Sequence, residues 1–148
     1  MVFYFHQKTI KKNEIINNKQ DVEFRKYNYQ NKSKFINCEF YTDVTSLKDP
    51  TQSLTYHVYL NDVYTILFSG CEFRNDASQN YAYGERGVGI SSVDAKLKVK
   101  EKCIGISCAS YDRSLFEGLN YGIIQFSSNP LRNLEVNSSD FIGNVVGI

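Results

Sequence analysis

Four phenylalanines anchor stretches of the chain in which apolar and polar residues alternate. Phe40, Phe73, Phe116 and Phe141 each stand two residues after a small side chain. Three of them follow an apolar residue by five positions, and two of these also follow one by seven. Alternation with a period of two residues predicts strands that bury one face. The anchors are 33, 43 and 25 residues apart, so the strands recur with a period in the twenties that insertions lengthen.

The repeat continues after each anchor. Phe116–Ile123 and Phe141–Ile148 both read F-x-G-x-x-x-G-I, and Arg86–Ile90 matches their Gly-Ile ends, with Gly87 in the place of the second glycine. This alignment makes segment 74–85, which is rich in Asn, Asp, Tyr, Ser and Gly, an inserted loop that protrudes from the repeat.

Recurrence of one strand-and-turn phrase predicts an all-β chain, namely a right-handed parallel β-helix of about four to five coils. Equivalent residues of successive coils then lie about 4.8 Å apart. We expect a phenylalanine ladder and a second ladder made of Cys38, Cys71, Ser114 and Ser139. A β-sandwich or an up-and-down barrel also has alternating strands, but neither repeats the same turn phrase, so we favour the β-helix.

The coils are expected to cover residues 34–148, with an additional strand at 95–99 in the longest gap between anchors. Residues 1–33 form either an N-terminal cap or the first coil. Within them, 22–27 is a candidate strand, whereas 11–19 fits either a short capping helix or a loop.

The four cysteines fall into two pairs with different expected roles. Cys38 and Cys71 are interpreted as buried thiols that act as small apolar side chains, because serine fills the same position later. The alternative is a reactive pair or a disulfide between adjacent coils. Cys103 and Cys108 bracket a short loop, and their spacing allows a local disulfide in an oxidising compartment. No pair has metal-site spacing and both histidines are isolated, so we expect no metal and no cofactor.

The charge balance narrows the classes of partner. The formal net charge is +1, from 17 basic and 16 acidic residues, which does not predict nucleic-acid binding. No apolar stretch is long enough to span a bilayer, so we expect no direct membrane insertion. The first residues lack the features of a secretory signal, and the sequence stops inside a repeat phrase. We therefore expect any export signal to lie upstream and the polypeptide to continue beyond Ile148, with an open C-terminal end to the solenoid.

The repeat phrases, taken in order, resemble those of a known group of proteins. They are Phe35–Phe40, Phe68–Phe73, Arg86–Ile90 and Phe116–Ile123, which read F-x-x-C-x-F twice, R-G-x-G-I, and F-x-x-L-x-Y-G-I. They are similar to phrases in the large β-helical surface proteins of gliding and gut-type Gram-negative bacteria, which the type IX secretion system exports. The resemblance covers about residues 34–148 and implies an extracellular location at the bacterial cell surface.

These observations favour a non-enzymatic scaffold or adhesin segment that presents loops to a glycan or a protein surface. The expected contact lies in the inserted loop, because tyrosine faces stack on sugar rings while aspartate and arginine hydrogen-bond to hydroxyl groups. The candidate ligand-binding residues are Asp76, Asn80, Tyr81, Tyr83 and Arg86. The alternative is that these side chains pack and cap the loop itself.

Two other functions remain open. A polysaccharide lyase or glycoside hydrolase would need paired carboxylates or a calcium cluster with a basic residue. The candidates, which fall at different places in the coil phrase and form no expected cluster, are Asp62, Glu72, Asp94, Arg86 and Arg113. We expect Asp94 to be a turn residue that satisfies backbone amides, and Glu39 and Glu72 to repeat on the solvent side. We therefore assign no catalytic residue. The third function is a passive structural subunit of a larger secretion or surface assembly.

Overall fold

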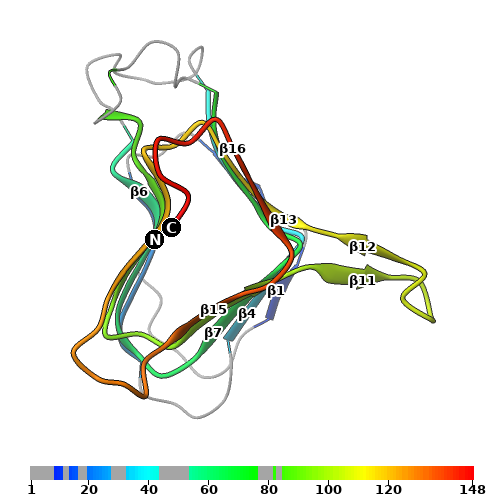
Figure 1. Ribbon diagram of the computed structural model, residues 1–148, viewed down its shortest axis with the longest axis horizontal. Helices are drawn as coiled ribbons and strands as arrows, with labels where there is room; N and C mark the ends of the chain where they lie inside the picture. Colours follow the sequence, from blue (N-terminus) through cyan, green and yellow to red (C-terminus); the bar gives the residue numbers. More distant parts are fainter. Residues whose placement is uncertain are drawn as a thin grey trace.

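The chain forms a parallel β-helix with three sheets around one core, seen along its axis in Figure 1. This computed structural model describes residues 9–11, 14–16, 20–27, 33–43, 54–76, 82 and 85–148. The first sheet contains β1 (Thr9–Lys11), β4 (Ser33–Ile36), β7 (Ile66–Ser69), β10 (Leu97–Lys100) and β15 (Leu134–Val136). The second sheet contains β2 (Glu14–Ile16), β5 (Glu39–Thr42), β8 (Glu72–Asn75), β13 (Ser114–Glu117) and β16 (Ser139–Ile142). The third sheet contains β3 (Gln20–Tyr27), β6 (Tyr56–Val63), β9 (Val88–Val93) and β14 (Tyr121–Phe126).

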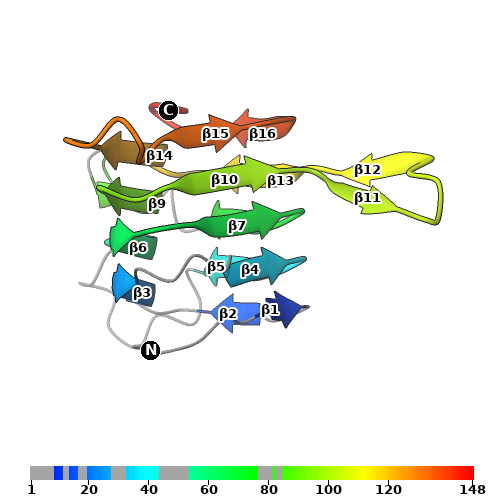
Figure 2. The same ribbon diagram turned by 90° about the horizontal axis from the view of Figure 1, so that it is seen from below.

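Each coil contributes one strand to each sheet in chain order, and the coils stack from the N-terminal to the C-terminal end (Figure 2). The first coil is β1–β2–β3 and the fifth begins with β15 and β16. All strand pairs within the three sheets are parallel. The backbone N–H and C=O groups of each coil are satisfied because they form hydrogen bonds with the coils above and below.

The phenylalanine ladder is confirmed by the strand register of the second sheet. Phe40 pairs with Phe73, Phe73 with Phe116, and Phe116 with Phe141. Their rings stack with centroids 4.7, 4.7 and 4.9 Å apart, which matches the spacing of neighbouring strands. In the first sheet Phe35 stacks on Phe68 at 5.0 Å. The core is therefore built from like side chains placed above one another.

The cysteine and serine ladder is confirmed as well. Cys38 and Cys71 are buried free thiols, so the alternative of a disulfide between coils is wrong. Ser114 takes the next position and its hydroxyl accepts a hydrogen bond from the Cys71 amide at 3.2 Å. The contact with Cys38, followed by burial, raises the pKa of the Cys71 thiol far above its ordinary value. A thiol held protonated in this way is a poor nucleophile, which fits the structural interpretation.

Left-handed residues turn the chain at the corners between sheets. Lys26, Asp62 and Asp94 turn it from the third sheet into the next coil, with φ of 52°, 51° and 47°. Asn37 and Gly70 occupy the corner between the first and second sheets, with φ of 51° and 57°. Asn, Asp and Gly adopt this backbone conformation at least cost, which explains their place in the repeat phrase.

The match of the Gly-Ile ends is confirmed by the pairing of Ile90 with Ile123, but the choice of Gly87 as the equivalent glycine was wrong by two residues. Val88 pairs with Tyr121, so Gly89 and not Gly87 is equivalent to Gly122. A Cβ atom on Gly89 would lie 2.5 Å from the Gly122 carbonyl oxygen and 2.9 Å from the ring of Phe116. Glycine is needed there because the phenylalanine ring of the next coil lies against the backbone.

The segment expected as an additional strand is the regular first-sheet strand of the fourth coil, β10. The extra length after it is a hairpin of β11 (Lys102–Ile104) and β12 (Ser110–Asp112). In the N-terminal segment, the candidate strand 22–27 is confirmed, because it lies in β3. Strand β2 lies in segment 11–19, where a helix or a loop was expected.

Candidate functional site

The most distinctive surface feature is the hairpin of residues 102–112, which we call the finger. It leaves the solenoid between β10 and β13, at a corner between the first and second sheets, and projects away from the coils (Figures 1 and 2). Its strands are antiparallel, with Lys102 opposite Asp112 and Ile104 opposite Ser110. The finger is thus an addition to the fourth coil that leaves the register of the neighbouring strands unchanged.

A disulfide between Cys103 and Cys108 closes the tip of the finger. The chain reverses inside this short ring through Gly105 and Cys108, both of which have positive φ. The bond predicted to be possible from the cysteine spacing is therefore present. A covalent closure restricts the conformations of a projecting loop, so that less entropy is lost when the loop binds.

The outer part of the finger, residues 103–111, is uncharged and largely apolar, and the charged residues Lys102 and Asp112 lie at its base. No charged residue occurs from Cys103 to Tyr111. Ile106 is fully exposed, and Ile104 and Tyr111 are about half exposed, at 46% and 56%. Single apolar residues on a surface are ordinary, but several on one projecting element indicate a contact surface.

The loop expected to bind a ligand is described only in part. Asn80, Tyr81 and Tyr83 lie outside the described residues. Asp76 accepts a hydrogen bond from the Tyr41 hydroxyl at 2.9 Å, and this bond raises the pKa of Tyr41. The carbonyl oxygen of Arg86 accepts a hydrogen bond of 2.7 Å from the side chain of Asn75, the last residue of β8.

Asp76 also belongs to a charged network on the outer face of the second sheet. Arg74 lies at its centre, 3.0 Å from a carboxylate oxygen of Glu117 and 3.5 Å from one of Asp76. Its guanidinium carbon lies 5.7 Å from the centre of the Tyr41 ring. The Asp76 carboxylate thus connects the end of β8 to Tyr41 of the preceding coil.

Glu39 and Glu72 repeat on the outer face, as expected. They are in register on β5 and β8, and Glu39 is exposed while Glu72 is half-buried. Burial and then the charge of Glu39 raise the pKa of Glu72. Two like charges one coil apart oppose stacking, and the neighbouring Arg74, 3.9 Å from Glu72, offsets part of this repulsion.

The acidic residues considered for catalysis are engaged in the structure of the corners. Asp62 and Asp94 occupy equivalent corner positions in successive coils, so the expectation that they fall at different places was wrong. Asp62 lies 3.4 Å from the Arg132 guanidinium. The Asp94 carboxylate accepts a hydrogen bond from the Ser128 amide at 2.7 Å, and this bond lowers the pKa of Asp94. The contact confirms that Asp94 is a turn residue that satisfies a backbone amide.

The remaining candidates lie elsewhere on the solenoid. Glu72 is on the outer face of the second sheet, and Arg113, at the base of the finger, pairs with Asp140 at 2.8 Å. Within the described ranges, no group of three or more His, Cys, Asp or Glu side chains is arranged to hold a metal ion. No helix long and apolar enough to cross a membrane occurs in this part of the chain.

A buried pair that the sequence did not suggest joins the first two coils. Nδ1 of His57 lies 2.5 Å from a carboxylate oxygen of Asp21, and Nε2 lies 3.1 Å from the carbonyl oxygen of Arg74. Both side chains of the pair are completely buried. The two residues are 36 positions apart, so only the register of β3 and β6 brings them together.

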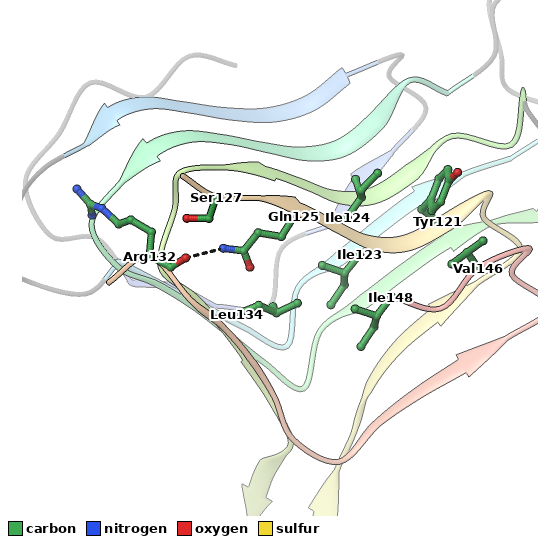
Figure 3. Close-up of a pocket in the computed structure, with 9 residues that line it drawn as sticks. All are labelled: Tyr121, Ile123, Ile124, Gln125, Ser127, Arg132, Leu134, Val146 and Ile148. Carbon is green, nitrogen blue, oxygen red and sulfur yellow. Dashed lines mark hydrogen bonds between the residues drawn. The ribbon is translucent and has the colours of Figure 1, made fainter. Parts of the chain in front are cut away.

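A pocket of about 420 Å³ lies over the last coil (Figure 3). Its lining combines apolar side chains such as Ile123, Leu134 and Ile148 with Gln125, whose amide donates to the Arg132 carbonyl oxygen at 3.0 Å. Ile123 continues the core column through Ile90. The pocket therefore has the chemistry of a place for another apolar side chain rather than for a polar ligand.

Comparison with known proteins gives no relative. No protein-family profile matches the chain. No curated protein and no solved structure matches it either.

Proposed function

We propose that the chain is a segment of a non-enzymatic surface solenoid, a scaffold or adhesin that presents projecting loops to a partner. The observation that carries this proposal is the finger: an uncharged apolar tip, closed by a disulfide, on a stack of coils that positions it. The cores of protein interfaces are depleted in charge and enriched in apolar side chains. The finger has this composition and is displayed away from the body of the molecule.

The disulfide supports an extracellular location. Disulfides persist in oxidising compartments and are rare in the cytosol. Cys103 and Cys108 form one, while the other two cysteines are buried inside the core. The resemblance of the repeat phrases to bacterial surface proteins exported by the type IX system points to the same compartment, at the cell surface.

A glycan remains a candidate partner at segment 74–85, where the tyrosines were identified in the sequence. The two ends of this segment are held by the second sheet, Asp76 through Tyr41 on β5 and Arg86 through Asn75 on β8. The finger and this segment leave the solenoid from different corners, so they offer two separate contact surfaces for the same scaffold.

Protein and glycan arrays probed in parallel test the proposal, with three forms of the chain. The first is unchanged, the second carries Ile104→Ser and Ile106→Ser, and the third carries Tyr81→Ala, Tyr83→Ala and Arg86→Ala. Binding that only the finger variant loses supports the finger as the contact. Binding that only the loop variant loses moves the contact to segment 74–85. Cleavage of an arrayed polysaccharide by the unchanged chain would instead favour the lyase or hydrolase alternative.

A further inference from the structure

A line of lysines runs along the outer face of the first sheet. Lys98 and Lys100 belong to β10 and Lys96 directly precedes that strand, while Leu97 and Val99 between them are buried. Because side chains alternate along a strand, all three side chains leave from one face, and their Cα atoms are about 6.6 Å apart from one to the next. We call these three residues the lysine stripe.

The neighbouring coils place little opposing charge around the stripe. The column through Lys98 contains Lys34 and Leu67 on the two preceding coils and Glu135 on the next one. Lys98 forms an ion pair with Glu135. Within the part of the chain that the structure describes, the other two stripe lysines form no ion pair. The face therefore keeps a net positive charge on a protein whose overall charge is close to zero.

A hollow of about 150 Å³ lies next to the stripe. Lys96 and Lys98 line it from one strand, and Thr65 and Asn133 line it from the coils on either side. The Thr65 hydroxyl donates to the Tyr64 carbonyl oxygen at 2.7 Å, so its own oxygen can still accept a hydrogen bond. The hollow thus combines ammonium groups with a hydroxyl, an amide and the Glu135 carboxylate, which is paired with Lys98. The hydroxyl groups of a ligand would meet hydrogen-bonding partners there, and its negative charges would meet Lys96.

We propose that the lysine stripe and this hollow bind an acidic polysaccharide, a linear glycan that carries carboxylate or sulfate groups. An extended strand displays its charges in a straight line, which suits a linear chain with a repeated anionic group. Single-stranded nucleic acid is bound with aromatic side chains that stack on the bases, and the stripe contains none. An anionic membrane requires a denser basic cluster than three lysines, one of them already paired.

The expected binding is weak for each charge and depends on polymer length. Exposed ion pairs contribute little individually, and physiological salt screens charges beyond about 8 Å. A short acidic oligosaccharide that reaches one lysine should therefore bind much less tightly than a polymer that contacts the whole stripe. This surface is separate from the finger, so the inference goes beyond the proposed function and does not depend on it.

The test measures binding of the full chain to immobilised polygalacturonate, alginate and heparin, with neutral dextran as a reference. The variant Lys96→Gln/Lys100→Gln should bind about three- to tenfold more weakly, as expected for two lost exposed ion contacts. A matched variant, Lys26→Gln/Arg113→Gln, removes the same net charge from exposed positions elsewhere and should bind like the unchanged chain. All variants are compared by circular dichroism to establish that the fold is intact.

A variant with the opposite effect makes the test sharper. Glu135→Gln releases Lys98 from its ion pair and should strengthen binding about twofold or more, with a steeper dependence on salt. Equal loss in the stripe variant and the matched variant would overturn the inference, because net charge alone would then explain binding. Weaker binding by Glu135→Gln, or tighter binding to duplex DNA than to any of the acidic polysaccharides, would overturn it too.

Discussion

Asp21 and His57 form a completely buried pair, with a carboxylate oxygen 2.5 Å from the imidazole Nδ1. The other imidazole nitrogen faces a backbone carbonyl oxygen, that of Arg74. The two ring nitrogens therefore bridge the Asp21 carboxyl group and the Arg74 carbonyl oxygen. The imidazole of His57 on the second coil thus connects Asp21 of the first coil to the backbone of the third.

Removal of one partner of this pair should be costly. Asp21→Ala leaves a buried imidazole without its acceptor, and we expect a loss of about 3–5 kcal/mol in the free energy of unfolding. Urea unfolding followed by circular dichroism measures the change. The double variant Asp21→Leu/His57→Phe replaces both polar groups with apolar ones and should lose less. A double variant as unstable as Asp21→Ala would show that packing, not the polar contact, accounts for the loss.

The phenylalanine ladder should respond to truncation at its centre. Phe116 is fully buried between Phe73 and Phe141, so Phe116→Ala leaves a cavity and should lower the free energy of unfolding by about 3–5 kcal/mol. Phe126 is 61% exposed, and Phe126→Ala should change stability by less than about 1 kcal/mol. Guanidinium unfolding curves of the two variants provide the comparison, and similar losses would contradict the stacked core.

The corrected glycine position can be tested directly. Gly89→Ala places a methyl group against the Gly122 carbonyl and the Phe116 ring, and we expect a loss of about 1–3 kcal/mol or more from overpacking. Gly143 has a positive φ and open space around its Cβ position, so Gly143→Ala should cost only about 1–2 kcal/mol of backbone strain. Thermal unfolding ranks the two variants, and the reverse order would contradict the register of β9 and β14.

Acid should loosen the loop after β14. Hydrogen bonds from Ser128 hold the pKa of Asp94 below its ordinary value, so the folded state binds this proton less readily than the unfolded state. The contribution of Asp94 is therefore present above the ordinary aspartate pKa and is lost as the pH falls through the lowered value. Hydrogen exchange of the Ser128 amide should show this loss of protection below about pH 4. In Asp94→Ala the amide should be unprotected at every pH, and unchanged protection would contradict the contact.

The disulfide should matter to the finger more than to the solenoid. In Cys103→Ser/Cys108→Ser the tip loses its covalent closure, and proteases should cleave between residues 104 and 110 at least about tenfold faster. The thermal midpoint of the solenoid should move little, because the finger lies outside the core. Mass spectrometry of timed digests locates the cleavage. A large fall in the midpoint would show that the finger supports the coils.

The ladders were predictable from the sequence because stacked coils place like on like. The phrase small-x-Phe occurs at the same phase in the second to fifth coils, and this phase fixes the register of Phe40, Phe73, Phe116 and Phe141. The position of Gly89 was not predictable in the same way, because Gly87 lies two residues away in a similar phrase. The two glycines differ in what surrounds them in space: Gly87 has a positive φ and lies against Leu54, whereas Gly89 lies against the Gly122 carbonyl oxygen and the Phe116 ring.

The candidate site was harder to predict than the fold. Cys103 and Cys108 indicated a possible disulfide, yet nothing local showed that their loop projects from a corner rather than folding onto a sheet. The alternating lysines of β10 were visible in the sequence, but their meaning depends on the charges of other coils. Asp21 and His57 gave no signal, because contacts across 36 residues follow from the number and length of the intervening turns.

The corner that carries the finger begins and ends at almost the same point in space. The Ser114 hydroxyl donates to the Lys100 carbonyl oxygen at 3.0 Å, across the whole insertion. The stack of Phe73 on Phe116 is as close as that of Phe40 on Phe73, although the chain between the first two is longer. A solenoid of this kind can exchange one projection for another at such a corner without redesign of its interior, so its recognition surface can diversify while its architecture stays constant.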